Sequence, residues 1–136
     1  MLADKEITDR IIGAAIQVDR TLGPGFLEAI YEEALAAEFD HLGISYERQQ
    51  TIRIEYRTKP IGEHRLDFLV EGKMVVELKA VNAIEDDHFA IVRSYLKATN
   101  LQSALLLNFA SMPLTTKRVG REESGRNKSV AEILLP

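Results

Sequence analysis

Cysteine is absent from the 136-residue chain. Its absence excludes disulfides and any zinc or iron–sulfur site with cysteine ligands, and it fits a reducing compartment such as the cytoplasm. Histidine is scarce as well: the chain has His41, His64 and His88, and no two of them have the spacing of a metal-binding pair. A site for a divalent cation would therefore have to be built from carboxylates.

Long apolar segments are missing too. No run approaches the roughly 18 apolar residues that a membrane-spanning helix requires, so we expect no membrane contact. Two acidic residues, Asp4 and Glu6, occur where a signal peptide would carry basic ones. We therefore expect a cytoplasmic protein.

Positive charge is not in excess, because the formal net charge is −4. A protein that coats duplex DNA through charge alone is usually basic, so this balance argues against broad nonspecific binding and leaves room for a local basic patch. Apolar residues make up 46% of the chain, which is enough for a core. The length fits a single domain over residues 1–136.

The spacing of apolar residues predicts the order of the elements. Helical spacing is found over 4–20, 26–41 and 86–99, and patterns typical of strands are found over 45–57, 63–70, 74–81 and 104–107. Gly43 is expected to end the second helix, and residues 58–62 are expected to form a turn. This order predicts an α/β (α+β) fold with a mixed four-stranded sheet flanked by helices.

The chain becomes polar and basic over residues 115–136, which we expect to form a C-terminal tail. Its cations are Lys117, Arg118, Arg121, Arg126 and Lys128. They could follow a phosphate backbone, or they could belong to a solvated tail. An apolar segment at 130–135 could cover a sheet edge in the same chain or in a second copy, so a homodimer is one expectation.

An acidic pair is predicted on the hairpin of the second and third strands. If residues 71–73 form the loop between these strands, the register places Asp67 directly opposite Glu77. Directly opposed side chains point to the same face, with Cβ atoms roughly 5 Å apart. Lys79 shares the face of Glu77, because side chains alternate along a strand.

Two carboxylates so close repel each other unless positive charge lies between them. Lys79 could supply that charge, and so could a divalent cation, for which oxygen ligands suit Mg²⁺ or Mn²⁺. A metal held there could activate water, with Lys79 positioning the water or neutralising charge on a phosphoryl group. The plainer alternative is that Glu77 and Lys79 form a solvated pair, although both strands are otherwise strongly apolar.

Four segments carry a resemblance to a known family: GFLEAIY at 25–31, RLD at 65–67, ELK at 77–79 and ALLLNF at 104–109. In this order and spacing, over roughly residues 5–120, the sequence resembles the GxxExxY family of the PD-(D/E)xK nuclease superfamily, near its RecB-like branch. The resemblance implies a restriction-endonuclease-like αβββαβ core. It also implies metal-dependent hydrolysis of phosphodiester bonds, in DNA, with Mg²⁺ or Mn²⁺.

The resemblance also implies roles for individual residues. Asp67 and Glu77 are implied as catalytic metal ligands, and Lys79 as the catalytic lysine. Glu28 is implied as a further catalytic and metal-binding carboxylate. It lies one turn before Tyr31 on the same helix face, so it could complete the cluster or simply favour the helix N-terminus. Tyr31 is expected to pack with its hydroxyl satisfied.

The third helix departs from the family pattern at one position. RecB-like relatives often carry Gln-x-x-x-Tyr there, and Tyr95 is present while Ile91 occupies the glutamine position. The same fold could therefore serve as a catalytically weak or inactive module that binds nucleic acid or protein. His88, near the start of this helix, resembles a recurring family histidine or acts as a cap.

Nucleic acid, in particular DNA, is the expected partner. Contacts are expected from Tyr95, from the arginines Arg65 and Arg93, and from Lys117 and Arg118. Arg65 could instead pair with the carboxylates, because strand alternation would place it on the face of Asp67.

Overall fold

The computed structural model describes residues 4–121. The helices are α1 (Asp4–Leu22), α2 (Glu28–Leu42) and α3 (Asp86–Thr99), and the strands are β1 (Tyr46–Tyr56), β2 (Lys59–Val70), β3 (Met74–Lys79), β4 (Ser103–Asn108) and β5 (Thr115–Gly120). The three helices confirm those expected from apolar spacing. Within the described residues, none of these helices has the length and apolar character needed to cross a membrane.

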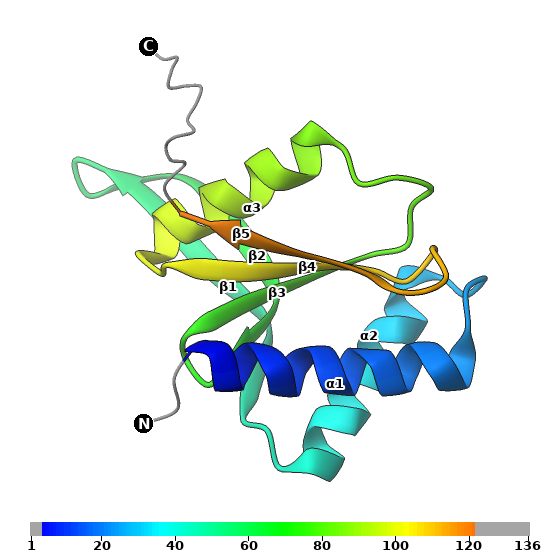
Figure 1. Cartoon of the computed structure of the whole chain (residues 1–136). Coiled ribbons are helices and arrows are strands. Elements are labelled where there is room, and N and C mark those ends of the chain that lie inside the picture. Colours follow the sequence, from blue (N-terminus) through cyan, green and yellow to red (C-terminus); the bar gives the residue numbers. More distant parts are fainter. Residues whose placement is uncertain (1–3, 122–136) are drawn as a thin grey trace.

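The strands form one mixed sheet in the order β1-β2-β3-β4-β5. Neighbours are antiparallel except β3 and β4, which run parallel and are connected through α3. A parallel pair needs such a crossover, because the chain must return to the same end of the sheet. Figure 1 shows α1 and α2 on one side of the sheet and α3 on the other, which confirms the α/β class.

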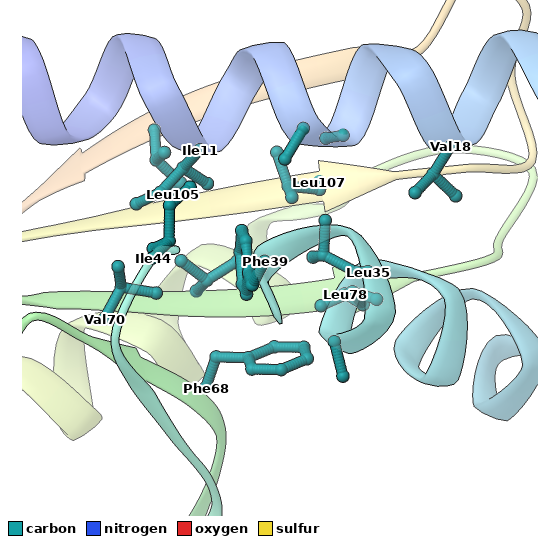
Figure 2. Close-up of a cluster of buried hydrophobic side chains, with 14 of the residues drawn as sticks. Ile11, Val18, Leu35, Phe39, Ile44, Phe68, Val70, Leu78, Leu105 and Leu107 are labelled. Atoms are coloured by element: carbon teal, nitrogen blue, oxygen red, sulfur yellow. The ribbon is translucent and has the colours of Figure 1, made fainter. Parts of the chain in front are cut away.

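Each face of the sheet buries its own apolar cluster. The larger cluster lies under α1 and α2, where Leu35 and Phe39 pack near Phe68 and Leu105 of the sheet (Figure 2). The smaller cluster joins α3 to the sheet and consists of Leu66, Val75, Val92, Leu96, Ala104, Leu106 and Val119. Full burial of each large apolar side chain contributes roughly 1.5 to 3 kcal/mol. The two clusters therefore fix the helices on both sides of the strands.

Both ends of α2 are fixed. Gly43 follows its last turn with a φ of 71°, the left-handed conformation expected of a terminating glycine. Near the other end, the hydroxyl of Tyr31 donates to the carbonyl of Gly23 at 2.6 Å and accepts from the backbone N–H of Phe26 at 3.1 Å. The buried Tyr31 ring stacks on Phe109, with centroids 4.8 Å apart. Its expected packing role is confirmed.

The sheet has five strands, so the expectation of four is wrong. Residues Thr115–Gly120, expected to begin a basic tail, pair antiparallel with β4. Val119 packs into the cluster under α3, whereas Lys117 and Arg118 remain exposed. Edge strands often carry charge, which discourages pairing with other chains and here hides the strand pattern. The rest of the expected tail, with its apolar segment at 130–135, lies outside the described residues.

The hairpin of β1 and β2 extends beyond the rest of the sheet (Figure 1). Strand β3 pairs with β2 only over Phe68–Val70. The hairpin turns at Arg57 and Thr58, whose φ angles are 51° and 64°. Positive φ at both positions is typical of two-residue hairpin loops. The expected turn over 58–62 is therefore wrong, because neither arginine nor threonine signals positive φ.

Candidate active site

The hairpin of β2 and β3 places Asp67 beside Glu77. Val70 pairs with Met74 and Phe68 with Val76, which is the register expected from a loop over 71–73. Backbone pairing of β2 with β3 stops at Phe68 and Val76, and hydrogen bonds between side chains and backbone join the strands at the next residues. The Asp67 N–H donates to Oε1 of Glu77 at 3.4 Å.

The carboxylate of Asp67 is held in return by the next strand. The backbone N–H of Leu78 donates to Oδ2 of Asp67 at 2.9 Å. Because a carboxylate replaces a carbonyl as acceptor, β2 and β3 separate beyond this point. The two acids therefore lie where the pairing of β2 with β3 ends.

An irregularity in β1 accompanies this divergence. Gln49 lies opposite Asp67, between the pairs Arg48–Phe68 and Gln50–Leu66, and has a φ of 51°. Its side-chain amide donates to Oδ1 of Asp67 at 3.3 Å. Leu66 and Phe68 would share a face on a regular strand, yet they pack in clusters on opposite faces.

The change of face at Asp67 affects Arg65. Regular alternation predicts Arg65 on the face of Asp67, but this alternation does not hold, because β2 changes face at Asp67. Arg65 is exposed, pairs across the hairpin with Thr51, and within residues 4–121 makes no ion pair with either carboxylate. A contact between Arg65 and phosphate stays a prediction.

Helix α2 brings two more carboxylates to the site. Glu28, its first residue, interacts electrostatically with Lys79 and Asp67. Glu32, one turn later, accepts from Arg48 Nη2 at 3.0 Å and from the amide of Gln49 at 2.9 Å. Sequence reasoning missed Glu32, although its spacing from Glu28 was a usable signal, since residues four apart share a helix face.

Burial and mutual repulsion perturb these acids. Glu77 is only 6% exposed, and burial, followed by the charge of Asp67, raises its pKa to about 8. Burial likewise raises the pKa of Asp67, and partial burial raises the pKa of the more exposed Glu28. Lys79 opposes the rise at all three. Full ionisation of the carboxyl groups of Glu28, Glu32, Asp67 and Glu77 would therefore place more negative charge at the site than Lys79 and Arg48 offset.

Tyr95 of α3 closes the other side of the site. Its hydroxyl forms a hydrogen bond with the Glu77 side chain, and burial, followed by the charges of Glu77 and Asp67, raises its pKa to about 12. The His64 ring packs edge-on against Tyr95, with centroids 4.8 Å apart. Tyr95 therefore lies against the acid pair, closer to the chemistry than a residue that contacts only nucleic acid.

His88 and Ile91 lie earlier on the same helix as Tyr95. Nδ1 of His88 accepts the backbone N–H of Glu85 at 2.9 Å, so His88 caps the start of α3. Ile91, one turn before Tyr95, is 44% exposed and brings no polar group to the position where relatives carry glutamine.

The remaining expected contacts lie elsewhere. Arg118 of β5 donates to Thr8 at 2.8 Å and to Ser103 at 3.1 Å, which ties the edge strand to α1 and β4. Lys117 is exposed on the same strand, at the sheet edge opposite β1. Arg93 lies on a different flank of α3 from Tyr95. The structure therefore does not bring these three cations to the carboxylates, and their binding to nucleic acid stays a prediction.

The donor set was compared with the needs of a divalent cation. Among residues 4–121, no three carboxylate or imidazole groups converge closely enough to hold a metal by themselves. Asp67 and Glu77 nevertheless offer two adjacent hard oxygen donors whose raised pKa values a cation would lower. Mg²⁺ is commonly bound by one or two carboxylates, with water and substrate oxygens completing its shell. The residues fit Mg²⁺ in that form.

Comparison with known proteins identifies the class. The family model described as the PD-(D/E)XK nuclease superfamily matches residues 5–119. The chain therefore belongs to the PD-(D/E)XK nuclease superfamily and has its restriction-endonuclease-like fold. This model is described by the superfamily alone, and the narrower resemblance to the GxxExxY proteins stays a prediction.

Single proteins were compared as well. A solved structure, "Crystal structure of SSO0001", is 12% identical to this chain and aligns over 89% of it and 68% of that chain, with a TM-score of 0.47. No curated protein matches the sequence.

Proposed function

We propose that this protein is a divalent-metal-dependent nuclease that hydrolyses phosphodiester bonds in DNA. The observation that carries the proposal is the contact between Asp67 and Glu77 where their strands diverge, with Lys79 acting on both charges. Membership of a nuclease superfamily supports the same reaction class.

The proposed metal ligands are Asp67 and Glu77, with Glu28 of α2 as a third carboxylate beside them. Bound Mg²⁺ or Mn²⁺ would supply Lewis acidity toward a phosphoryl oxygen and toward water. The chain positions its own donors beforehand. The Leu78 N–H and the Gln49 amide orient Asp67, and the Tyr95 hydroxyl orients Glu77.

Lys79 and Glu28 have separate roles in the hydrolysis. A water oxygen bonds to phosphorus, an ester P–O bond breaks, and the departing oxygen takes a proton from solvent. The ammonium of Lys79 stabilises the negative charge that grows on the phosphoryl oxygens. Glu28 accepts a proton from the attacking water, because a carboxylate of raised pKa is a stronger base than a fully solvated one.

Calorimetric titration with Mn²⁺, combined with cleavage assays on labelled DNA and RNA, tests the assignment. The wild type is expected to bind metal and cut DNA. Asp67→Asn and Glu77→Gln should lose both the binding heat and the cutting, whereas Lys79→Ala should keep the binding heat and lose the cutting. Glu63→Gln, which neutralises an exposed acid on β2, is the matched control and should do both. Unchanged binding heat in Asp67→Asn would refute the ligand assignment.

A second candidate function rests on Ile91. An exposed aliphatic side chain at this position supplies no hydrogen bond to the site or to nucleic acid, which favours a module that binds without cutting. That candidate predicts that wild type, Asp67→Asn and Glu77→Gln bind nucleic acid equally and that no strand is cut with Mg²⁺ or Mn²⁺. Ile91→Gln should then leave cleavage absent, whereas a weak nuclease should gain activity.

A further inference from the structure

A cavity of about 420 Å³ lies on the outer side of α3, and three of its five lining residues are cationic. It is lined by Ala90, Arg93, Ser94, Lys97 and Arg121. The four helix residues share one face by their spacing of three and four. Arg121 arrives from the end of β5, where its backbone N–H donates to the carbonyl of Gln102 at 3.0 Å.

Among residues 4–121, the lining of this cavity contains three cations and no acidic side chain. Within residues 4–121, Arg93, Lys97 and Arg121 take part in none of the ion pairs of the fold. The nearest acid that α3 carries on this face is Asp86, which precedes Arg93 by roughly 10 Å along the helix axis. Like charges gathered together repel one another, and an anion between them relieves that repulsion. In a chain of net charge −4, the cavity is therefore a local concentration of positive charge.

We propose that this cavity holds a backbone phosphate of a nucleic-acid strand whose scissile bond lies at Asp67 and Glu77. Arginine presents a planar fork of donors that matches phosphate oxygens, lysine adds a point charge, and the hydroxyl of Ser94 is a neutral donor of the kind that contacts DNA backbones. The proposal rests on the proposed function and adds a binding subsite to it.

A line of contacts joins the cavity to the acid pair. Ser94 Oγ lies 2.6 Å from Nε2 of His64, the His64 ring packs on Tyr95, and the Tyr95 hydroxyl bonds to Glu77. The cavity lining and Tyr95 face different sides of α3, and the diameter of a helix with its side chains puts the separation of the cavity from the acids at about 10–12 Å. At about 3.4 Å per base step, this separation corresponds to roughly three nucleotides.

The distance between the cavity and the acid pair distinguishes a nucleic-acid strand, which can reach both, from a small anion, which cannot. A dinucleotide bound at the carboxylates cannot reach the cavity, whereas a single strand of a dozen nucleotides can occupy both places. Inorganic phosphate could fill the cavity alone, so the ligand's length decides between the two sources of phosphate.

Binding measured by fluorescence anisotropy in EDTA tests the proposal without any cleavage. The probes are a labelled oligothymidylate of 12 nucleotides, thymidine dinucleotide and, as competitor, inorganic phosphate. Lys97→Gln and Arg121→Gln should each weaken 12-mer binding several-fold and reduce the slope of log affinity against log salt by about 0.7. Dinucleotide binding should not change. Arg20→Gln, an exposed arginine on α1 across the sheet, removes the same charge and should behave as wild type.

Each outcome decides the question. An unchanged salt slope in Lys97→Gln, or a wild type that does not bind the 12-mer, overturns the subsite. Equal loss of inorganic phosphate and 12-mer binding also overturns it, in favour of a small-anion pocket. If the wild type cuts DNA and the variants leave the salt slope unchanged, the proposed nuclease function stands and the phosphate subsite is refuted. If the wild type never cuts but the variants reduce the salt slope, the phosphate subsite stands and the proposed nuclease function is refuted.

Discussion

Replacing Glu77 by glutamine should remove a pH-dependent loss of stability from the metal-free protein. The pKa of Glu77 is about 8 in the fold, against 4.5 for an unperturbed glutamate. Between these pH values the folded chain keeps a proton that the unfolded chain has released. Stability therefore falls as pH rises through this window, because the unfolded state binds fewer protons than the native state.

The size of the loss follows from the difference between the two pKa values. At about 1.4 kcal/mol per pKa unit, a difference of three to four units corresponds to roughly 5 kcal/mol. Part of it belongs to the coupled charge of Asp67, and the site relaxes once Glu77 ionises. We therefore expect a loss on the order of 3 to 5 kcal/mol between about pH 5 and about pH 8.

Urea unfolding in EDTA, from about pH 5 to about pH 9, measures this loss. The wild-type midpoint should fall steadily, whereas Glu77→Gln should show a much flatter profile and be the more stable protein above about pH 8. Glu63→Gln, with its exposed side chain, should follow the wild type. Added Mg²⁺ should restore stability to the wild type at high pH, because a cation favours the ionised carboxylate. A wild-type profile as flat as that of Glu77→Gln would refute the reasoning.

Three further substitutions address the frame around the site, each measured by urea unfolding. Tyr31→Phe should cost about 1 to 2 kcal/mol, because the Gly23 carbonyl and the Phe26 N–H lose their shared partner; an unchanged midpoint would contradict this. Asn108→Ala should cost about 2 to 4 kcal/mol, since the buried amide serves both backbone groups of Val81, and a smaller loss than for Tyr31→Phe would count against it. Thr58→Gly should stabilise by up to about 1 kcal/mol, because glycine adopts the φ of 64° without strain; destabilisation would show that the Thr58 side chain matters more than its backbone.

The acid pair could be predicted because it depends on local rules. A short loop containing Gly72 fixes the hairpin register as far as Phe68 and Val76, and Asp67 and Glu77 are the next residues along the two strands. The helices followed from apolar spacing, since each buries one face on the sheet. These features need only the immediate neighbours in the chain.

The features that were missed depend on longer-range geometry. A glutamine gives no signal for a positive φ, so the conformation of Gln49 and its hydrogen bond to Asp67 could not be predicted. The change of face at Asp67, which alters the side of the sheet expected for Arg65, could not be predicted for the same reason. Strand β5 escaped notice because an edge strand is half solvated and its charges resemble those of a tail. The approach of Tyr95 to Glu77 depends on how α3 crosses the sheet, which spacing along the helix does not determine.

The stack of Tyr31 on Phe109 also reaches the site. The backbone N–H of Phe109 donates to the carbonyl of Lys79 at 2.9 Å, so the ring that anchors α2 is joined to the residue that ends β3. Helix α2 cannot leave the strand locally without breaking buried contacts, and amides around this junction should exchange with solvent only through global opening. The spacing between Glu28 and Lys79 is thus established during folding, and no binding energy is consumed in assembling it when a ligand arrives.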